Sequence, residues 1–416
     1  MTHGFKSTTF AALDIGSSKV CCVIAKVDRD GQIAIAGYGY NASSGIKNGI
    51  VTDINKATLA VCNAVEAAEQ RANERISKII VNVSGDKIYS SIKNATITLN
   101  KNRPICEADL NKVLEKGLNK INVEGGELIH CLPTNYRLDG GEEIKDPRNI
   151  FAEKLSVDII LGLVPEIMYR NLSTVIENAH LEIVGRAFSS YASGLACLVE
   201  DEKEIGATVI DIGGGTTSIA SFKHGYPVYF SSIPVGGNNV TNDIAYGLTT
   251  SIANAERLKT YHGCAFLTSK DKEETINVYP VGEEDDSCIR QITRADLISI
   301  ITPRIEEIFE LVNKKLEEQG LKDMPSHRVV LTGGGSQLPG IREVAAMVLD
   351  KEVRVWRPKA DLNQPEVFTN PAYSTCIGLL MFALNYTEKR PNKIINKPVR
   401  SSQGFGKIFS WIKQNF

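Results

Sequence analysis

Two copies of one short motif carry the residue types that bind phosphate. Asp14-Ile15-Gly16-Ser17-Ser18-Lys19 and Asp211-Ile212-Gly213-Gly214-Gly215-Thr216-Thr217 each begin with an aspartate and continue into a small, polar turn. Glycine lets a phosphate approach backbone N–H groups closely, and hydroxyl side chains add donors. Lys19 adds a positive charge, and each aspartate could face a Mg²⁺ ion that bridges the phosphates. One copy alone suits an ordinary β-turn, but the pair predicts two loops that grip a nucleotide from both sides.

A third glycine-rich turn and one charged pair could complete a nucleotide site. The run Leu331-Thr332-Gly333-Gly334-Gly335-Ser336 follows an apolar strand and precedes a helix. Bare glycine backbone lets a flat ring lie close, and a helix N-terminus can receive phosphate. Glu256 and Lys259 share a helix face at i, i+3 spacing, where they could hold ribose hydroxyls and a purine edge. Taken singly, the turn also suits a common strand-to-helix connection, and the charged pair also suits a surface ion pair.

The elements around the first motif predict the opening of a ribonuclease-H-like half. Each phosphate motif joins two apolar runs, which predicts a β-hairpin. The expected elements are strands Thr9–Asp14, Lys19–Val27 and, after an Asp30-Gly31 turn, Gln32–Tyr38, helix Asn55–Asn73, and the buried strand Ile79–Ser84. The helix has an apolar face that includes Leu59 and Cys62.

The segment 86–164 interrupts this rhythm with a small α+β pattern of its own. It holds a strand at Ala95–Leu99, a helix at Glu107–Lys120, a strand pair around Asp139-Gly140-Gly141 and a long strand at Glu153–Leu163. Because it begins after a buried strand and ends before the helix Glu166–Ala179, it predicts an inserted subdomain.

The second half has its own hairpin and its own helices. Thr241 is predicted to cap a helical region that runs to Tyr261. A polar, acidic stretch at 268–290 predicts an irregular or β excursion, and apolar residues at helical spacing from Ile301 to Leu316 predict a long amphipathic helix. Two further helices are expected at Gly340–Leu349 and Ala372–Leu384.

These elements predict a multidomain α/β protein. The expected parts are a first half (1–85, completed by 165–204 and 362–384), the insert (86–164), a second half (205–361, with an outer lobe at about 232–302), a basic linker (385–403) and a terminal amphipathic helix (404–416). The chain of 416 residues is 43% hydrophobic and has a net charge of −2, so its composition does not indicate a nucleic-acid partner.

The C-terminal segment predicts attachment to a membrane surface. At helical spacing, Phe405, Ile408, Phe409, Ile412 and Phe416 form one apolar stripe, with Trp411 at its flank and Lys407 and Lys413 off it. Residues 389–416 contain seven Lys or Arg and no Asp or Glu. A terminal helix can also dock on its own domain, but aromatic and lysine residues behind a basic linker favour anionic lipid.

The cysteines predict a reducing compartment. There are nine, an odd number, with no CxxC pair, at positions 21, 22, 62, 106, 131, 197, 264, 288 and 376. We therefore expect small buried thiols in the cytoplasm, and neither disulfides nor metal ligands.

The order of these motifs resembles the actin, Hsp70 and sugar-kinase superfamily, and most closely the FtsA family of bacterial actin-like division proteins. The resembling segments are LDIGSSKV (13–20), NGIVTDI (48–54), VNVSGDKI (81–88), VIDIGGGTT (209–217), IPVGGNNVTNDIAYGL (233–248), AERLK (255–259) and VVLTGGGSQLPGI (329–341). The resemblance covers essentially the whole chain. It implies an actin-like ATPase fold: two ribonuclease-H-like halves around a nucleotide cleft, an inserted small α+β subdomain and a C-terminal amphipathic helix.

The resemblance also implies roles for individual residues. The Gly16–Lys19 and Gly213–Thr217 turns would bind ATP phosphates, and Asp14 and Asp211 would contact Mg²⁺ through water. Gly236 and Gly237 would border the cleft, Glu256 and Lys259 would contact ribose and adenine, and Gly333–Ser336 would pack on the nucleoside. Asn48–Asp53 would lie near the phosphates.

The resemblance further implies a biological role. The protein would self-associate on the inner face of the cytoplasmic membrane at the division site, bind the C-terminal peptide of the tubulin-like FtsZ through the 232–302 region, and recruit later division proteins through 86–164. Actins place a water-orienting Gln before the second hairpin, but His180–Gly194 contains none, so hydrolysis would be slow at most. Two alternatives stay open on the same fold: a pilus-type assembly ATPase, which would lack the tail, and a small-molecule kinase, which would need a carboxylate base in an acceptor pocket.

Overall fold

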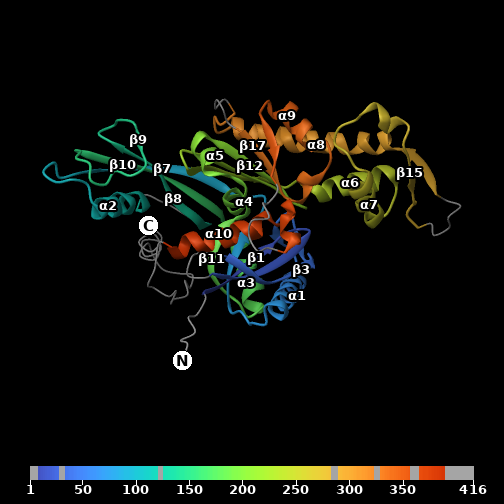
Figure 1. Ribbon diagram of the computed structural model, residues 1–416, viewed down its shortest axis with the longest axis horizontal. Helices are drawn as coiled ribbons and strands as arrows, with labels where there is room; N and C mark the ends of the chain where they lie inside the picture. Colours follow the sequence, from blue (N-terminus) through green and yellow to red (C-terminus); the bar gives the residue numbers. More distant parts are fainter. Residues whose placement is uncertain are drawn as a thin grey trace.

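The computed structural model has an elongated outline with three β-sheet regions joined near its centre (Figure 1). The structure describes residues 8–27, 33–119, 125–282, 289–322, 328–356 and 365–388. The Asp30-Gly31 turn, most of the linker and the whole terminal helix predicted from the sequence lie outside these residues.

The first half is built on a five-stranded sheet with the order β11-β6-β1-β2-β3. Its strands are β1 (Thr8–Ile15), β2 (Lys19–Val27), β3 (Ile33–Ala42), β6 (Lys78–Val83) and β11 (Glu182–Phe188). The β1, β2 and β3 strands pair antiparallel in sequence, while β1 pairs parallel with β6, and β6 with β11. The predicted strands are confirmed, although β3 extends to Ala42 and β11 was not anticipated.

The second half repeats this topology in a sheet with the order β14-β13-β12-β17-β18. Its strands are β12 (Ala207–Ile212), β13 (Thr217–Lys223), β14 (Tyr226–Ile233), β17 (Arg328–Thr332) and β18 (Val353–Val355). Again the first three strands pair antiparallel and the last two add in parallel. The same order in both sheets confirms two ribonuclease-H-like halves, each with an Asp-Ile-Gly turn between its first two strands.

The insert forms a separate four-stranded sheet covered by one helix. The order is β7-β10-β8-β9, with β7 (Tyr89–Thr98), β8 (Gly126–Leu138), β9 (Glu143–Ile144), β10 (Lys154–Pro165) and helix α2 (Glu107–Leu118). Strand β7 begins earlier than the predicted Ala95. The buried side chains of α2 and of the sheet pack into their own core.

The insert contacts both halves. His130 on β8 is fully buried, and its Nε2 accepts a hydrogen bond from the backbone N–H of Phe188 in the first half (2.9 Å). Burial lowers the pKa of His130 to about 3, so the ring stays neutral. On the other side, Ser90 Oγ bonds both the carbonyl (2.9 Å) and the N–H (3.1 Å) of Phe230 on β14. The exact domain boundaries given above stay a prediction.

Two helices cross between the halves and carry residues of the site. They are α4 (Ser189–Cys197) and α10 (Ser374–Glu388). At their crossing the backbones touch, because a Cβ atom on Gly378 would lie only 1.8 Å from the Ala192 carbonyl oxygen. Such an approach requires glycine and fixes the two helices against each other.

The other helices cover the sheets and the outer lobe. They are α1 (Ile54–Ala72), α3 (Glu166–Asn178), α5 (Glu200–Ile205), α6 (Gly237–Leu248), α7 (Ile252–His262), α8 (Arg294–Glu317) and α9 (Ile341–Leu349). The excursion at 268–290 is in part a hairpin of β15 (Thr275–Val278) with β16 (Arg290–Thr293), and Figure 1 shows it at the far right end.

Three predictions about helices were wrong in detail. The predicted cap Thr241 lies inside α6, which already begins at Gly237. The predicted single helix to Tyr261 is two helices, because Thr249 adopts a left-handed φ of 51° and Ser251 caps α7 through the Asn254 N–H. On α1, Leu59 and Cys62 face solvent, because the buried positions are the small residues Ala57, Ala60, Val61, Ala64, Val65 and Ala68.

The end of the described chain and the cysteines bring two more corrections. Helix α10 continues to Glu388, past the predicted linker start at 385, because no proline interrupts the chain before Pro391. Cys62 and Cys106 are exposed, so the prediction of buried thiols fails for them, whereas five others are buried. In the part of the chain that the structure describes, no helix is long and apolar enough to cross a bilayer.

Candidate functional site

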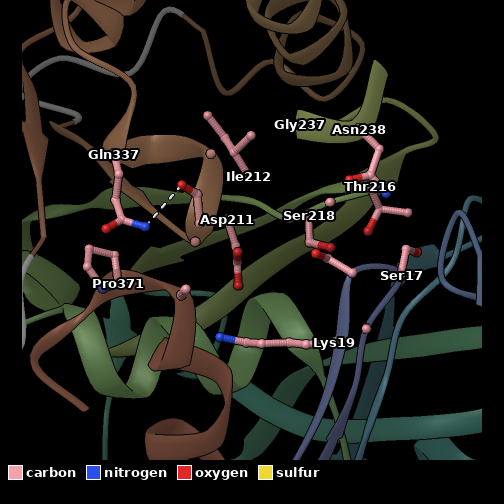
Figure 2. A pocket seen from close by; sticks show the side chains of 18 of the residues that line it. Ser17, Lys19, Asp211, Ile212, Thr216, Ser218, Gly237, Asn238, Gln337 and Pro371 are labelled. Atoms are coloured by element: carbon pink, nitrogen blue, oxygen red, sulfur yellow. Dashed lines mark hydrogen bonds between the residues drawn. The ribbon is translucent and has the colours of Figure 1, made fainter. Parts of the chain in front are cut away.

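A cleft of about 550 Å³ opens between the two halves, which is the size of a small-molecule site. Side chains and backbone from all three glycine turns line it. Figure 2 shows Ser17 and Thr216 at one end, Gln337 and Pro371 at the other, and Lys19 and Asp211 between them. The predicted residues that line the cleft are Asp14, Gly16, Ser17, Ser18, Lys19, Asp211, Gly213, Gly214, Thr216, Gly237, Glu256, Lys259, Gly333, Gly334 and Gly335.

The two Asp-Ile-Gly turns have the same backbone closure. In the first, the N–H of Gly16 donates to the Lys19 carbonyl at 3.0 Å, and in the second the N–H of Gly213 donates to the Thr216 carbonyl at 2.9 Å. The turns project toward each other from the two halves. Each therefore presents its tip to the other across the cleft.

The tips of the two turns are in contact. A Cβ atom on Gly214 would lie 2.8 Å from Ser18 Cβ, and one on Gly215 would lie 2.7 Å from Ser17 Oγ. Ser17 Oγ also accepts a hydrogen bond from the Gly49 N–H at 2.8 Å, which brings this part of the 48–53 segment to the first turn. The glycines are therefore required for the approach of the second turn to the first.

Asp14 is held by an amide and is half-buried. Asn82 Nδ2 donates to Asp14 Oδ1 at 2.7 Å, and it also donates to Ser189 Oγ at 3.0 Å. Burial raises the pKa of Asp14 to about 7, against the opposing effect of Lys19, and the nearby Asp211 raises it further. A carboxylate in this setting is stabilised by any cation that enters the cleft.

Asp211 is held by two hydroxyls from the crossing helices. Ser193 Oγ on α4 donates to Asp211 Oδ2 at 2.5 Å, and Thr375 Oγ1 on α10 donates to the same oxygen at 3.2 Å. Burial raises the pKa of this carboxyl as well, and the two hydroxyl donors and Lys19 lower it in part. The crossing helices thus hold Asp211 directly, whereas α4 reaches Asp14 only through Ser189 and Asn82.

Lys19 rests on an aromatic ring. Its Nζ lies 3.3 Å from the centroid of the Tyr373 ring, and burial lowers the pKa of this lysine, while Asp14 is among the groups that oppose the shift. The ammonium therefore lies between the two carboxylate-bearing turns without being the direct partner of either.

The N-terminus of α6 supports the second turn. The N–H groups of Gly237 and Asn238 donate to the carbonyls of Gly213 (2.9 Å) and Gly214 (2.7 Å). A Cβ atom on Gly236 would lie 2.5 Å from the Gly213 carbonyl oxygen, so glycine is needed there. This use of the first amides explains why α6 begins at Gly237 and not at Thr241.

Glu256 and Lys259 form the predicted pair at one side of the cleft. Lys259 Nζ contacts Glu256 Oε2 and Thr241 Oγ1, each at 2.7 Å, and the Gly237 carbonyl at 3.1 Å. Its side chain is 17% exposed against 52% for Glu256. The lysine is therefore pinned to the α6 terminus, and the glutamate carboxylate keeps one side free for a ligand hydroxyl.

The third turn packs against the second. Gly333 has a φ of 82°, and a Cβ atom there would lie 2.2 Å from Asp211 Oδ1. A Cβ atom on Gly335 would lie 2.4 Å from Ile212 Cγ2. The turn therefore brings bare backbone up to the cleft beside the Asp211 carboxylate.

Comparison with known proteins agrees with this geometry. A family described as "Cell division protein FtsA" matches residues 208–378, and one described as "SHS2 domain inserted in FTSA" matches residues 85–161. The FtsA of Agrobacterium fabrum is 35% identical over 433 residues, which covers 99% of this chain and 96% of that protein. The FtsA of Escherichia coli is 30% identical, with 97% of each chain covered.

The chain belongs to the FtsA family.

It is therefore an actin-like cell division protein, and the alternative of a small-molecule kinase is excluded. Solved structures show the same fold at low sequence identity. A PilM–PilN type IV pilus biogenesis complex matches with a TM-score of 0.62 and 15% identity over 91% of this chain and 99% of that one. MreB5 of Spiroplasma citri bound to ADP matches with a TM-score of 0.57 and 14% identity, over 92% and 99%.

Four of the nucleotide-contact residues predicted for this FtsA-family chain do not line the cleft: Gly215, Thr217, Gly236 and Ser336. Thr217 Oγ1 donates to the Val235 carbonyl (2.9 Å), and Ser336 Oγ donates to the Gly333 carbonyl (2.8 Å), so both hydroxyls hold neighbouring turns. Gly215 and Gly236 provide close packing.

Several residues of the site were missed in the sequence. Asn82, Ser189, Ser193 and Thr375 surround the two aspartates, and Asn238 lies at the α6 terminus. Asn82 had a signal, because it is the one amide in the strand Lys78–Val83, where every other residue after Lys78 is apolar. The serines and the threonine had none, since small hydroxyl residues are common in helices that pack closely.

The described residues around the cleft do not form a ready-made metal site. Among the described residues, no group of three or more His, Cys, Asp or Glu side chains could hold a metal ion. The chemistry of the two carboxylates suits a magnesium ion that is contacted through water and takes phosphate oxygens as its other ligands, since Mg²⁺ usually keeps several waters. The predicted membrane residues, from Phe405 to Phe416, lie outside the described residues.

Proposed function

We propose that this FtsA-family chain binds Mg²⁺-ATP in the cleft, self-associates as an actin-like polymer, and tethers the FtsZ ring to the inner face of the cytoplasmic membrane. The observation that carries the ATP proposal is the pair of identically closed turns, facing each other, with an aspartate at the base of each whose pKa is raised by desolvation. Two negative charges in a shielded cleft favour a divalent cation, and glycine backbone with a lysine favours phosphate.

Each part of the cleft has a distinct task in this proposal. Ser17, Ser18 and Lys19 donate to the phosphates from one side, and the Gly213–Thr216 turn does so from the other. Asp14 and Asp211 hold water around Mg²⁺, which would neutralise the phosphate charge. Glu256 accepts from ribose, and the Gly333–Gly335 turn lies against the nucleoside.

Hydrolysis would be slow at most. The helix that crosses the halves, α4, presents Ser189 to the cleft and Ser193 to Asp211, and neither is the long amide that actins use to orient water. Both hydroxyls are already engaged by Asn82 and Asp211. ATP would then act mainly as the ligand that holds the two halves together, which favours longitudinal self-association.

The outer lobe at 232–302 is proposed to bind the C-terminal peptide of FtsZ, and the insert at 86–164 to contact later division proteins. Three large side chains on one part of the lobe support a docking role: Tyr246 is 92% exposed, Val281 58% and Ile252 56%. A backbone bridge between Thr250 and Pro280 joins the segments that carry them.

Tethering is proposed to depend on residues 404–416, as an amphipathic helix on anionic lipid. One short helix binds a membrane weakly, but many copies in one polymer add their affinities. ATP would therefore strengthen membrane attachment through polymer formation.

The test of nucleotide binding is Asp211→Ala, measured by equilibrium titration with ATP in the presence and absence of Mg²⁺. We expect the variant to lose most of the Mg²⁺-dependent gain in affinity, about tenfold or more, because one of two carboxylates is gone. The exposed Asp350→Ala serves as the control. Equal Mg²⁺ dependence in the wild type and Asp211→Ala would contradict the metal role.

The test of tethering is co-sedimentation with anionic vesicles, with and without ATP, for the full chain and for a chain truncated after Ser402. We expect only the full chain to pellet with lipid, and more so with ATP. A truncated chain that pelleted equally well would overturn the anchor proposal and leave the nucleotide proposal untouched.

A further inference from the structure

The contact between Lys19 and Tyr373 has no role in the functions proposed above. We propose that the face of the Tyr373 ring positions the Lys19 ammonium for the phosphate chain, and that the turn carrying Tyr373 links the nucleoside end of the cleft to its phosphate end. This inference rests on the proposed binding of ATP and names a positioning residue for it.

The first observation is the geometry of the contact. Lys19 Nζ lies 3.3 Å from the centre of the Tyr373 ring, well inside the range of a cation–π interaction. Tyr373 is 8% exposed, so the ring face is shielded from bulk water, where such an interaction is stronger. No ion pair joins Lys19 to a carboxylate among the residues the structure describes.

The second observation is that the ring is held in place by other rings. Phe368, fully buried, packs edge-on against Tyr373 with centroids 5.3 Å apart, and Tyr38 packs edge-on against Phe368 at the same distance. The guanidinium of Arg71 covers Tyr38 at 4.5 Å. The row of rings therefore runs from helix α1 to the phosphate turn, and it leaves Tyr373 little freedom to rotate.

The third observation is the set of bonds that join this turn to the second half. Thr332 Oγ1 and Ser374 Oγ lie 2.5 Å apart, and Asn370 Nδ2 donates to Gln337 Oε1 at 2.9 Å. Gln337 Nε2 in turn donates to the Gly334 carbonyl at 3.2 Å (Figure 2). Residues 370–374 thus touch the third glycine turn on one side and Lys19 on the other.

An aromatic partner has a consequence that a carboxylate partner would not have. A carboxylate bound to Lys19 would cancel its charge and would repel phosphate, whereas a ring compensates the cation weakly and carries no net charge. The ammonium can therefore be fixed in advance and still present its full charge to a phosphate. The Lys19 side chain loses its conformational entropy when the protein folds and not when ATP binds, so its affinity for the phosphate chain should be higher.

The experiment compares Tyr373→Phe with Tyr373→Leu in the full chain, by titration with Mg²⁺-ATP and with adenosine. Phe keeps the ring face, so we expect its Kd for ATP to stay within about twofold of the wild type. Leu lacks the face, so we expect its Kd for ATP to rise by about 3- to 30-fold. The Kd for adenosine, which has no phosphate, should not change for either variant.

A double-mutant cycle with Lys19 shows whether Tyr373 acts through the lysine. In a Lys19→Met background, Tyr373→Leu should have no further effect on ATP affinity. An equal loss in that background, or an equal loss for adenosine, would overturn the proposal in favour of a packing role. If Tyr373→Leu does not fold, as judged by thermal unfolding, Tyr373→Met replaces it with a longer, more adaptable side chain.

The outcomes separate this inference from the function on which it rests. If the wild type binds ATP and the Leu variant binds it equally tightly, Tyr373 has no positioning role but the cleft remains a nucleotide site. A wild type that does not bind ATP would overturn both proposals.

Discussion

The two Asp-Ile-Gly hairpins share one backbone and differ in what they place on it. Both have the same strand pairing and the same closing hydrogen bond. The first turn carries three side chains that line the cleft, those of Ser17, Ser18 and Lys19. The second carries Gly214 and Gly215 at the matching place, where those same serines leave no room for a Cβ atom.

The carboxylates differ in a corresponding way. Asp14 is held by an amide, with Asp211 nearby to oppose its charge, whereas Asp211 is held by two hydroxyl donors. The first half therefore supplies most of the donor side chains and the positive charge. The second half supplies bare glycine backbone and the carboxylate with two hydroxyl donors, Asp211. The two turns are thus complementary where they meet, and the following substitutions test this difference between them.

The largest effect is expected at the point where the second hairpin meets the third turn. Gly333→Ala places a Cβ atom 2.2 Å from Asp211 Oδ1 at a φ of 82°. We expect a loss of about 3 kcal/mol or more in the free energy of unfolding, together with loss of ATP binding. Urea unfolding and ATP titration measure the two.

A matched control separates crowding from backbone strain at this position. Gly282 has a φ of 80° and nothing within 4 Å of its Cβ position. Gly282→Ala should lower the free energy of unfolding by only about 1 kcal/mol, because the left-handed backbone conformation is the only source of strain there. If both variants lost the same free energy, close packing at Gly333 would not matter for stability.

The next effect depends on pH and distinguishes the two carboxylates. Burial raises the pKa of Asp14 to about 7, so the folded state binds a proton more tightly than the unfolded chain does. Stability is therefore lost as the pH rises from about 4 to about 7. Asp14→Asn removes this loss, and we expect a gain of about 2 to 4 kcal/mol at pH 8 that vanishes near pH 4.

Asp211→Asn should show a smaller gain of the same sign. The Ser193 and Thr375 hydroxyls already stabilise the ionised form of Asp211, so less is recovered when the charge is removed. Thermal unfolding of both variants without nucleotide, from pH 4 to pH 8, measures the difference. Equal gains would mean that the two carboxylates are not held differently.

The sequence allowed the architecture and the turns to be predicted because each half repeats a local pattern. Apolar strands that flank an Asp-Ile-Gly turn specify a hairpin whatever surrounds it, and both hairpins were confirmed. The insert and the long helix α8 also have clear periodicity. Local conformation and contacts within one element can be predicted from neighbouring residues in the chain.

Contacts between side chains on different elements could not be predicted from the sequence. Ser193 and Thr375 approach Asp211 from helices that are far apart in the sequence. Thr241 looked like a helix cap, but the first amides of α6 are used by the second phosphate turn, so the helix begins earlier. Thr217 and Ser336 were predicted to be ligand donors, yet each hydroxyl donates to a backbone carbonyl, that of Val235 and that of Gly333. Such choices depend on tertiary contacts.

A smaller effect tests the contact between the turn tips. Gly214→Ala puts a Cβ atom 2.8 Å from Ser18 Cβ, and Ser18→Gly removes that neighbour. We expect Gly214→Ala to weaken ATP binding by about tenfold, because the halves cannot close fully, and Ser18→Gly to restore about half of the lost free energy. Asn238, whose amide lies 3.2 Å from the same position, should prevent full rescue.

The double-mutant cycle is measured by ATP titration of the wild type, the two single variants and the double variant. Ser18→Gly alone should weaken binding slightly, since one hydroxyl donor is lost. Strictly additive effects would show that the two tips do not meet in the nucleotide-bound protein, and the complementarity of the hairpins would then be limited to the free state.

The smallest effect compares Ser189 and Ser193 of α4, one for each half. Ser193 donates directly to Asp211 at 2.5 Å, while Ser189 accepts from Asn82, which in turn holds Asp14. Removing a donor from a buried carboxylate raises its pKa further and weakens its hold on a cation.

We therefore expect Ser193→Ala to raise the Mg²⁺ concentration needed for half-maximal ATP binding by about fivefold, and Ser189→Ala by no more than about twofold. The titration is run at pH 6 and pH 8, because the raised pKa of Asp211 should make the Ser193→Ala defect grow as the pH falls. Equal shifts for the two variants at both values would mean that α4 supports the two carboxylates alike, and that the hairpins differ only in their tips.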